Sequence, residues 1–571
     1  MLTFSPYLQI MLRYLPLLFL LVACSQDPLS LNVIETNEPV LETGLQTIED
    51  LPETPLAEGR ALLPEHDDLT LRMSYRLPEG SKASLVLEGE YAFSLDQARM
   101  PEAVPRTEMD VSADSWQELE LSYKSATEDN PALLASVYLN GNLLYYQQPL
   151  TGKADGPLSI EVSSGEVEIA DVAYSKSAGR SSSVDPHGII KLNVPLLRYE
   201  LYDLEPGTAD VKNWAAMKPV KTGYTNRFDI NYLREGKNAF ALRFFGKLNV
   251  PQAEEYNFQL WSSNPVRARI YIDGVERLHR GGEQSTWRAN ETLKLPEGMH
   301  DVRVDYIQKG GWNAFDIGYV VKGQEKMFLN SMKGRKAIAR PGETNALAVE
   351  TDDRPYLLRS FLYYPAPKVY EASDKRTHVI SVGEGQGPHY SLDLQSGALL
   401  QVWRGKFADV HAMWDARGEP QVMKPLGNAM VLDGRMQWAN SAVDTWPDFP
   451  DDPDEDDFAH RAHELDEAGR PTFLYSFGPG EVSDKIVPDG NGLLRELSFN
   501  AGGNPEAFTQ VAAARSITET APGQYELRGP GLKISIESYD GEGLTLQRGG
   551  GVDRLIAQIP AKGHLRYRID W

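Results

Sequence analysis

The sequence has almost no cysteine, since Cys24 is the only one among 571 residues. A single cysteine excludes intramolecular disulfides, cysteine-ligated zinc sites and haem attachment through a Cys-x-x-Cys-His motif. The folded part of the chain must therefore draw its stability from packed hydrophobic cores.

Long hydrophobic runs and an excess of positive charge are missing as well. A helix that crosses a bilayer needs about 20 apolar residues, whereas the apolar run near the N-terminus covers only residues 15–22. Lys and Arg number 57 against 81 Asp and Glu, which gives a formal net charge of −24. We expect no binding to nucleic acid, because non-specific binding depends on basic side chains that neutralise phosphates.

The N-terminal residues have the order of a bacterial signal peptide. Arg13 supplies the positive charge, residues 15–22 form the apolar segment, and Ala23 and Cys24 stand where a cleavage site belongs. The sequence Leu-Val-Ala-Cys at 21–24 resembles the lipobox of bacterial lipoproteins. This resemblance implies cleavage before Cys24 and attachment of acyl chains such as palmitate to it.

Residues 1–23 are thus expected to be a lipoprotein signal peptide, and Cys24 the lipid attachment point. More than one acyl chain gives a stable membrane anchor. Ser25 is not Asp, which by resemblance to the enterobacterial sorting rule favours the outer membrane. The alternative is an ordinary secretory peptide with a chance cysteine.

Residues 24–60 are expected to be an acidic, disordered tether. Residues 26–59 include eight Asp or Glu and four prolines but no Lys or Arg. Like charges repel one another and proline interrupts helices, so a segment of this composition stays extended. Its expected role is to hold the folded part away from the membrane.

The rest of the sequence predicts an all-β fold. Short alternating hydrophobic runs end in Gly, Asn or Asp, and no long amphipathic helix stands out, which favours antiparallel β-sandwiches over βαβ units. A Ser-rich stretch at 175–184 and a stretch with Gly and Pro at 334–350 are the expected linkers. We therefore predict a multi-domain protein with β-rich blocks at 61–176, 190–332 and 355–571.

The first block contains a clear hairpin signal at Asn140 and Gly141, because Asn-Gly supplies the positive φ angles of a type I′ turn. Four segments in order resemble the C-terminal strands of the 3-keto-disaccharide hydrolase domain, a concanavalin-like jelly roll: 116–121, 138–141, 156–160 and 167–172. Members of that family commonly carry a Tyr-Glu-x-Gln strand. The nearest counterpart reads Tyr-Ala-Phe-Ser at 91–94, and Ala92 cannot act as an acid, a base or a metal ligand.

This departure leaves no catalytic residue to predict in the first block. Glycoside hydrolysis normally requires two carboxylates that flank the scissile bond. The Glu-x-Asp-x-x-Glu strand of laminarinase-like jelly rolls does not occur in the sequence. Binding or scaffolding is therefore favoured over catalysis.

The second block resembles, over essentially its whole length, the glycan-binding module named after anthrax protective antigen. The resemblance is carried by the segments 246–251, 255–261, 268–274 and 295–306, with an Asp273-Gly274 turn. It implies a β-sandwich that binds carbohydrate. Modules of this type often carry an Asp-Asp-Gly turn, but the corresponding residues 262–265 read Ser-Ser-Asn-Pro, so calcium is not favoured and no cofactor is predicted.

Sugars are held by an aromatic face and by hydrogen bonds from amides or carboxylates. A Gly-flanked loop carries Trp312 and Asn313, and the other predicted carbohydrate-binding residues are Asp273 and Trp287. The alternative for Trp312 is a role in capping the core. For Trp287, and for Trp261, inward packing is the stronger alternative.

The third block resembles an uncharacterised β-rich domain of secreted bacterial proteins that often accompanies c-type cytochrome or sugar-dehydrogenase modules. An acidic run at 448–457 lacks the spacing of an EF-hand and is expected to be a solvated loop. His460 and His463 are expected to share a helix face with Glu464, but they lack the His-Glu-x-x-His spacing of zinc peptidases. We predict no metal site.

Five further residues of the third block fit either a pocket or a packed core, and the sequence leaves this open: His389, Asp393, Trp403, Arg404 and Trp414. The Gly-rich segment 383–387 is not followed by a helical pattern, which makes a nucleotide-binding loop improbable.

The preferred hypothesis is a non-catalytic cell-envelope lipoprotein that binds carbohydrate or polysaccharide. One alternative is a hydrolase of glycosides or 3-keto-glycosides, acting through the first or third block. Another is a structural subunit of an envelope redox or sugar-dehydrogenase complex. The expected partners are a glycan, the membrane through the lipid anchor, and an envelope enzyme.

Overall fold

The computed structural model describes residues 29–571 with internal gaps. The residues outside the description are 36–44, 53, 65, 102, 107–108, 110, 127–130, 152–155, 177–181, 185–187, 195, 226, 264–265, 282–287, 312–314, 330–346, 365–373, 386, 415–420, 441–445, 448–457, 479, 501–506 and 530. The structure is 61% strand and 2% helix, which confirms the predicted all-β class. In the described part, no helix combines the length and the apolar character needed to cross a membrane.

The first unit (residues 45–176) is a sandwich of two antiparallel sheets. Its strands are β2 (Gln46–Thr47), β3 (Arg60–Leu63), β4 (Leu69–Arg76), β5 (Lys82–Leu87), β6 (Tyr91–Ser94), β7 (Gln117–Lys124), β8 (Leu133–Leu139), β9 (Asn142–Pro149), β10 (Leu158–Ser164) and β11 (Glu168–Ser175). They form a six-stranded sheet, β2-β11-β4-β7-β8-β9, and a four-stranded sheet, β3-β10-β5-β6. In β7, Leu119 and Leu121 are buried in the core while Glu118 and Glu120 face outward, because successive side chains alternate across a strand.

The second unit (residues 182–329) is another two-sheet sandwich with its own hydrophobic core. Its main strands are β14 (Leu197–Asp203), β15 (Lys221–Thr225), β16 (Phe240–Val250), β17 (Glu254–Ser262), β18 (Val266–Ile272), β19 (Val275–Arg280), β20 (Asn290–Leu295), β21 (Gly298–Gln308), β22 (Phe315–Val321) and β23 (Met327–Phe328), with a short pair β12 (Ser183–Val184) and β13 (Ile190–Lys191). The sheet orders are β15-β14-β16-β21-β18-β19 and β20-β17-β22-β23. One helical turn, α2 (Ile230–Leu233), and a 3-10 turn at Trp214–Ala216 lie between β14 and β16.

The third unit (residues 347–571 together with 29–35) is the largest. Its eight-stranded sheet has the order β33 (Phe458–Leu465), β34 (Pro471–Phe477), β35 (Gly480–Asp489), β36 (Gly492–Asn500), β43 (Lys562–Asp570), β40 (Leu532–Tyr539), β39 (Gln524–Arg528) and β38 (Ser516–Ala521). A five-stranded sheet contains β25 (Tyr356–Tyr364), β26 (Asp374–Gly383), β27 (His389–Asp393), β28 (Leu399–Trp403) and β31 (Ala429–Val431). A second five-stranded sheet contains β1 (Leu31–Glu35), β41 (Leu544–Arg548), β42 (Asp553–Gln558), β37 (Phe508–Ala514) and β32 (Trp438–Ala439). A small sheet of β24 (Ala348–Val349), β29 (Lys406–Asp409) and β30 (Lys424–Leu426) and a short helix α3 (His411–Trp414) complete it.

An ion pair lies at the centre of this third unit. The Arg495 guanidinium donates to both oxygens of Asp484, at 3.1 and 2.7 Å, and also to the oxygens of Gln437, Tyr567 and Gly397. The Asp484 side chain is 0% exposed and that of Arg495 is 3% exposed. Burial lowers the pKa of Arg495, but the charge and hydrogen bonds of Asp484 and Tyr567 together raise it by more, so the guanidinium stays charged.

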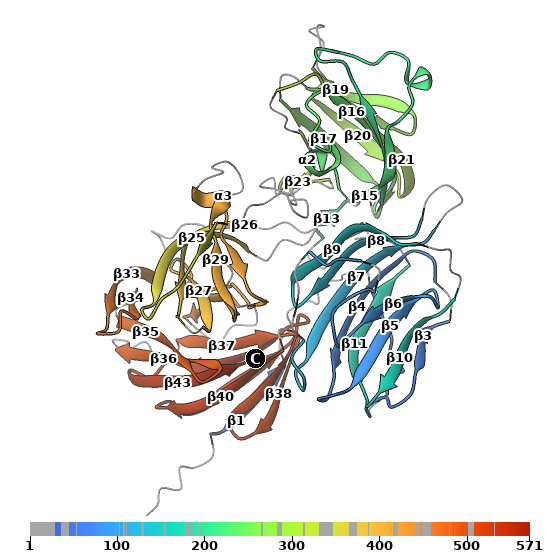
Figure 1. The fold of residues 1–571 in the computed structure, drawn as a ribbon. Helices are drawn as coiled ribbons and strands as arrows, with labels where there is room; N and C mark the ends of the chain where they lie inside the picture. Colours follow the sequence, from blue (N-terminus) through green and yellow to red (C-terminus); the bar gives the residue numbers. More distant parts are fainter. Residues whose placement is uncertain are drawn as a thin grey trace, which may run out of the picture.

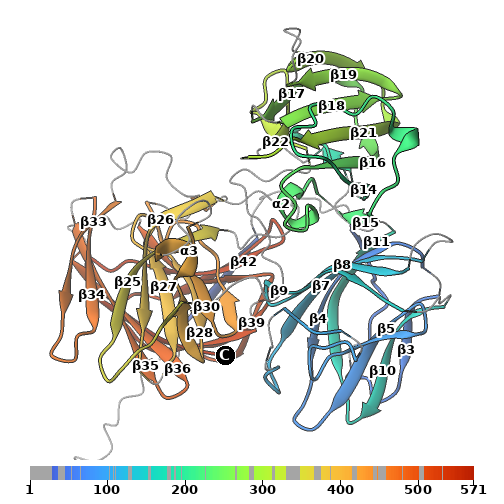
Figure 2. The same ribbon diagram turned by 45° about the horizontal axis from the view of Figure 1, so that its top comes forward.

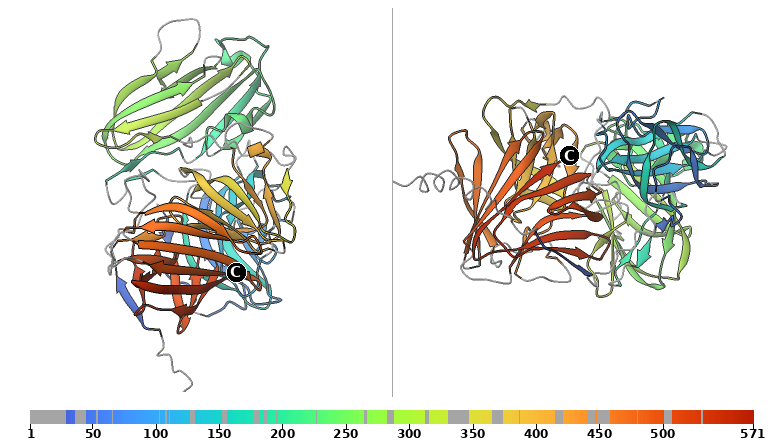
Figure 3. Two further views of the ribbon diagram at one scale, coloured as in Figure 1. Left: turned by 90° about the vertical axis from the view of Figure 1, so that its left-hand side faces the viewer. Right: turned by 90° about the horizontal axis from the view of Figure 1, so that it is seen from below.

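The first unit contacts both of the other units. Figure 1 shows the second unit above the first, with the third unit beside the first. In Figure 2 β39 of the third unit lies next to the first unit, and the right-hand view of Figure 3 shows these two units side by side. The strands around β8, β9 and β15 form the junction of the first two units.

The expectation that residues 24–60 form a disordered tether throughout is wrong for the described part of that segment. β1 pairs in parallel with β41, and β2 pairs with β11. Leu31 packs against the core of the third unit, whereas Ile48 and Leu51 pack against the core of the first. Apolar side chains spaced among the acidic ones therefore overcome the repulsion that composition alone predicted.

Candidate carbohydrate-binding site

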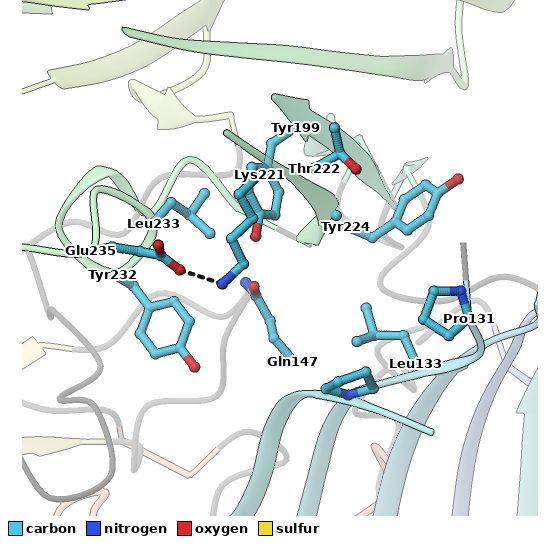
Figure 4. Close-up of a pocket in the computed structure, with 12 residues that line it drawn as sticks. Pro131, Leu133, Gln147, Tyr199, Lys221, Thr222, Tyr224, Tyr232, Leu233 and Glu235 are labelled. Atoms are coloured by element: carbon cyan, nitrogen blue, oxygen red, sulfur yellow. Dashed lines mark hydrogen bonds and ion pairs between the residues drawn. The ribbon is translucent and has the colours of Figure 1, made fainter. Parts of the chain in front are cut away.

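A pocket of about 450 Å³ lies where the first and second units meet (Figure 4). The first unit contributes β8 and β9, and the second contributes β14, β15 and the segment around α2. The lining residues are Pro131, Leu133, Gln147, Pro149, Tyr199, Lys221, Thr222, Gly223, Tyr224, Tyr232, Leu233 and Glu235. The volume falls in the range of pockets that bind small molecules.

Aromatic side chains supply part of the pocket wall. Tyr199 points inward from β14, directly across the sheet from Gly223 on β15. A Cβ atom at Gly223 would lie 2.9 Å from the Tyr199 ring, so only glycine leaves room for the tyrosine in this position. The local sequence thus shapes the pocket around the ring.

Tyr232 is held by the capping of α2. Asp229 accepts a hydrogen bond from the Tyr232 amide at 3.1 Å, as an N-cap residue does. Asp229 also accepts from Arg227 Nε at 3.1 Å, and both side chains of this pair are buried. Burial lowers the pKa of Arg227, but Asp229, Tyr146 and Tyr138 together more than offset this and raise it overall. The Tyr232 ring meets Tyr146 of the first unit edge to face, with centroids 4.9 Å apart.

Gln147 is the most unusual residue of the pocket. Its backbone has φ +50°, in the left-handed region that residues other than glycine rarely adopt. Its Nε2 atom is buried beside Tyr146, and the hydrogen bond from Gln147 acts to lower the pKa of that tyrosine. Figure 4 shows the amide pointing toward Lys221, into the space between the units. Strained backbone is concentrated at functional sites.

The two charged side chains at the pocket mouth, Lys221 and Glu235, neutralise each other. Lys221 Nζ forms an ion pair with the Glu235 carboxylate, and both side chains are partly exposed (Figure 4). Together with Gln147 they offer hydrogen-bond donors and acceptors opposite the tyrosine rings. This combination suits a neutral ligand with several hydroxyl groups and an apolar face.

The predicted carbohydrate-binding residues are only partly within the described chain. Outside it lie Trp287, Trp312 and Asn313, as does Cys24, the predicted lipid attachment residue. Asp273 is described and stands at the turn between β18 and β19 with φ +52°. Its carboxylate binds His300 Nδ1 at 2.7 Å and accepts from the Asp301 amide at 2.9 Å. Both oxygens therefore have partners within the protein.

Asp273 also lies far from the loop that leads to Trp312. Its amide bonds to Asp301, near the start of β21, whereas Gly310 and Gly311 follow the other end of that strand, at Gln308. At 3.4 Å per residue the two places are roughly 25–30 Å apart. Asp273 and Gly310 therefore lie toward opposite ends of β21.

Of the five candidate residues in the third unit, some are buried in the core and others lie at the surface. His389, Asp393 and Trp403 are fully buried packing residues, and Arg404 stacks on Trp571 at 4.7 Å. Trp414 is 49% exposed, so these residues do not line one pocket. The acidic run 448–457 lies outside the described residues.

The two predicted helical histidines lie in a strand. His460 and His463 belong to β33, which corrects the helix expected around them. The 460–464 spacing fits a helix, but pairing with β34 decides the conformation. Among the described residues, no three His, Cys, Asp or Glu are grouped so as to hold a metal ion.

The outer face of the six-stranded sheet in the first unit carries carboxylates, but the third unit covers it. Glu168 pairs with Arg76 at 2.7 Å, and Asp171 with Arg528 of β39 at 3.4 Å. Glu118 pairs with Arg515, which immediately precedes β38. These acids are neutralised by arginines instead of facing each other across an open groove. The arrangement argues against a glycosidase site on this face.

Stacking of two guanidinium groups on the Trp116 ring also contributes to the contact between the first and third units. The guanidinium groups of Arg76 and Arg528 each lie 5.0 Å from the centroid of the Trp116 ring. Arg76 also pairs with Glu526 of the third unit at 3.0 Å. The sequence predicts Trp116 only as the start of a strand. Its position between the guanidinium groups of Arg76 and Arg528 depends on both units.

The pocket residues could not be found from the sequence. Gln147 and Tyr232 are 85 positions apart and belong to different units, so no local motif connects them. The one usable signal was the Asn140-Gly141 turn, which fixes where β9 begins. It does not reveal that Gln147 has a positive φ.

Comparisons with known proteins add little to what the pocket itself shows about function. No protein-family model and no curated protein matches the chain. Among solved structures, a β-glucosidase from Kluyveromyces marxianus aligns with 22% of the chain at 18% identity and TM-score 0.17, and the alignment spans 16% of the β-glucosidase. A GH31 α-xylosidase from Xanthomonas citri aligns with 47% of the chain and 38% of its own length, at 14% identity and TM-score 0.15.

An anti-sigma factor domain-containing protein aligns with 48% of the chain and 81% of its own length, at 15% identity and TM-score 0.20. Two of these three structures are thus glycoside hydrolases. TM-scores of this size carry no argument about function, which has to rest on the site itself.

Proposed function

We propose that the protein binds a neutral saccharide in the pocket between its first two units, and that it does so in the bacterial cell envelope, anchored by lipid on Cys24. The observation that carries the proposal is a tyrosine-lined pocket in which Lys221, Glu235 and Gln147 offer hydrogen-bonding groups. Ligand hydroxyls would bond to these groups, and the tyrosine rings would pack against the apolar face of a sugar.

A non-catalytic role fits the polar groups at the pocket. Glu235 is the one carboxylate among the lining residues, and it is paired with Lys221. Acid–base cleavage of a glycosidic bond normally needs a second carboxylate on the other side of the bond. The pocket is thus suited to holding a saccharide.

Two substitutions at Gln147 test the proposal. Gln147→Gly removes the amide but suits the positive φ, so the fold should be as stable as before or slightly more stable. Gln147→Asn keeps an amide and also tolerates this backbone conformation. On a glycan array and by calorimetry with the best ligand, we expect Gln147→Gly to weaken binding about 3- to 10-fold, as loss of one hydrogen bond does.

Tyr232→Ala tests the aromatic wall, and Trp414→Ala, which removes an exposed aromatic side chain in the third unit, serves as its control. Tyr232→Ala should weaken binding while Trp414→Ala leaves it unchanged. Absence of binding to every saccharide on the array, or equal binding by all variants, would refute the proposal.

The anchor is tested separately by Cys24→Ser. We expect metabolic labelling with radioactive palmitate to mark the original protein but not this variant. Labelling that persists in the variant would contradict lipid attachment at Cys24 and leave the pocket assignment unaffected.

A further inference from the structure

A second polar groove, of about 370 Å³, lies on the outer face of the eight-stranded sheet in the third unit. It is formed by β36, β40 and β43 and is separate from the saccharide pocket. Ser538, His564, Lys562 and Arg566 line it. We propose that Ser538, His564 and Asp540 form a nucleophilic triad there, which hydrolyses small carboxylic esters.

The three side chains are connected in the order that this chemistry requires. Ser538 Oγ lies 2.8 Å from His564 Nε2, and His564 Nδ1 lies 2.7 Å from Asp540 Oδ2. In the tautomer that satisfies both contacts, Ser538 donates to Nε2 while Nδ1–H donates to Asp540. A serine–histidine–carboxylate triad is recognised by this geometry and not by sequence order.

Local backbone features place the triad. Ser538 and Asp540 are two residues apart on and just after β40, so they share one face. A bulge at Ile536 and Ser538, where β40 pairs with β43, adjusts the direction of the serine. Asp540 accepts a hydrogen bond from the His564 amide at 2.9 Å, and its own amide donates to the His564 carbonyl at 3.0 Å.

Gly563 makes the approach of the aspartate possible. Its φ is +156°, and a Cβ atom at this position would lie 2.7 Å from Asp540 Cβ and 2.9 Å from Asp540 Oδ2. A side chain here would push the carboxylate away from His564. The glycine immediately before the histidine is therefore part of the same arrangement.

Two cations border the nucleophile. Arg566 is fixed by Glu537 at 2.9 Å and lies 3.8 Å from Glu496. Lys562 has no ion-pair partner among the residues that the structure describes, and it lines the same groove. Because Glu496 also lines the groove and Arg566 is paired with two carboxylates, Lys562 is the cation available to stabilise the oxyanion that forms when an ester carbonyl is attacked.

The reaction proceeds in two balanced steps. The Ser538 oxygen forms a bond to the acyl carbon while its proton passes to His564 Nε2, and the carbon–oxygen bond to the alcohol breaks as the alcohol takes that proton. Water then attacks the acyl-serine, gives a proton to His564, and releases the carboxylic acid as the serine recovers its proton.

The groove indicates the substrate class. The His564 and Asp540 side chains are 40% and 47% exposed, so the alcohol portion of the ester can be large. Phe499 is the one large apolar side chain among the lining residues and is only 3% exposed, so these residues offer no apolar channel for a long acyl chain. The expected substrates are small acyl groups, such as acetyl, on a polar alcohol.

The experiment treats the full chain with a fluorophosphonate and locates the adduct by mass spectrometry. p-Nitrophenyl acetate hydrolysis is measured for Ser538→Ala, His564→Ala and the control Ser535→Ala, which changes a serine of the same strand β40 that does not line the groove. We expect the adduct on Ser538, and a loss of about 100-fold or more in rate for the first two variants but not for the control. Free imidazole should partly restore His564→Ala.

Asp540 is a positioning residue, so Asp540→Asn should lower kcat with little change in KM and no change in melting temperature. An adduct on any residue other than Ser538, or hydrolysis by Ser538→Ala at the original rate, would overturn the proposal. The adduct is mapped on the unsubstituted chain, so the test stands even if a variant fails to fold. Saccharide binding is unaffected by either result.

Discussion

Replacing Asp484 with asparagine should strongly destabilise the third unit. The change keeps the shape of the side chain but removes its charge, which leaves the Arg495 guanidinium buried without a counterion. Breaking one partner of a buried ion pair costs about 3–5 kcal/mol. For a unit of this size each kcal/mol shifts the melting temperature by about 2–4 °C, so the expected decrease is about 6–20 °C.

A matched control is available on the same strand. Asp489 pairs with Arg568 at 2.7 Å, but both side chains are about one-third exposed. Exposed pairs contribute only about 0–1 kcal/mol, so Asp489→Asn should lower the melting temperature by no more than a few degrees. Differential scanning calorimetry of the full chain measures both variants under the same conditions.

A double substitution separates the ion pair from simple packing. Asp484→Leu combined with Arg495→Met replaces both charges by apolar groups, which is often neutral or stabilising for buried pairs. We expect this variant to melt well above Asp484→Asn. The reasoning would be refuted if Asp484→Asn melted within about 2 °C of the original chain, or no lower than Asp489→Asn.

Three further predictions concern the other units. Burial lowers the pKa of His300, but the hydrogen bonds to Asp273 and to the Pro296 carbonyl, together with the Asp273 charge, raise it overall. The stabilisation by His300 is therefore present below about pH 6.5 and is lost as pH rises through the folded pKa, so His300→Gln should remove a loss of urea stability in the second unit between pH 6 and 8. Arg528→Ala should loosen the first unit from the third, seen as a larger radius of gyration in X-ray scattering, while an unchanged radius would contradict the assigned contact. Gly223→Ala should cost about 1–3 kcal/mol through crowding of Tyr199 and should weaken saccharide binding; full retention of both would contradict the packing inferred here.

Local chemistry explains which features the sequence could predict. Asn140 and Gly141 have φ angles of 49° and 78°, and Asp273 and Gly274 have 52° and 77°. These residue pairs favour such angles by themselves, so the two hairpins were predictable. The alternation of apolar and polar residues in β7 likewise determined the all-β class.

Features that depend on distant partners were not predictable. β1 is five residues long and acquires its conformation only by pairing with β41. His460 and His463 have a spacing that fits a helix, and pairing with β34 overrides it. Ser538 and His564 belong to neighbouring strands with no sequence signature, because a triad is defined by three-dimensional placement.

The pairing of β1 with β41 has a consequence for how the protein is made. The partners are separated by more than 500 residues, so the first described strand of the chain waits for one of the last before its edge is covered. At about 5–20 residues per second, synthesis leaves this edge open for roughly half a minute to two minutes. The parallel pairing of β1 with β41 therefore forms only after nearly the whole chain has been made.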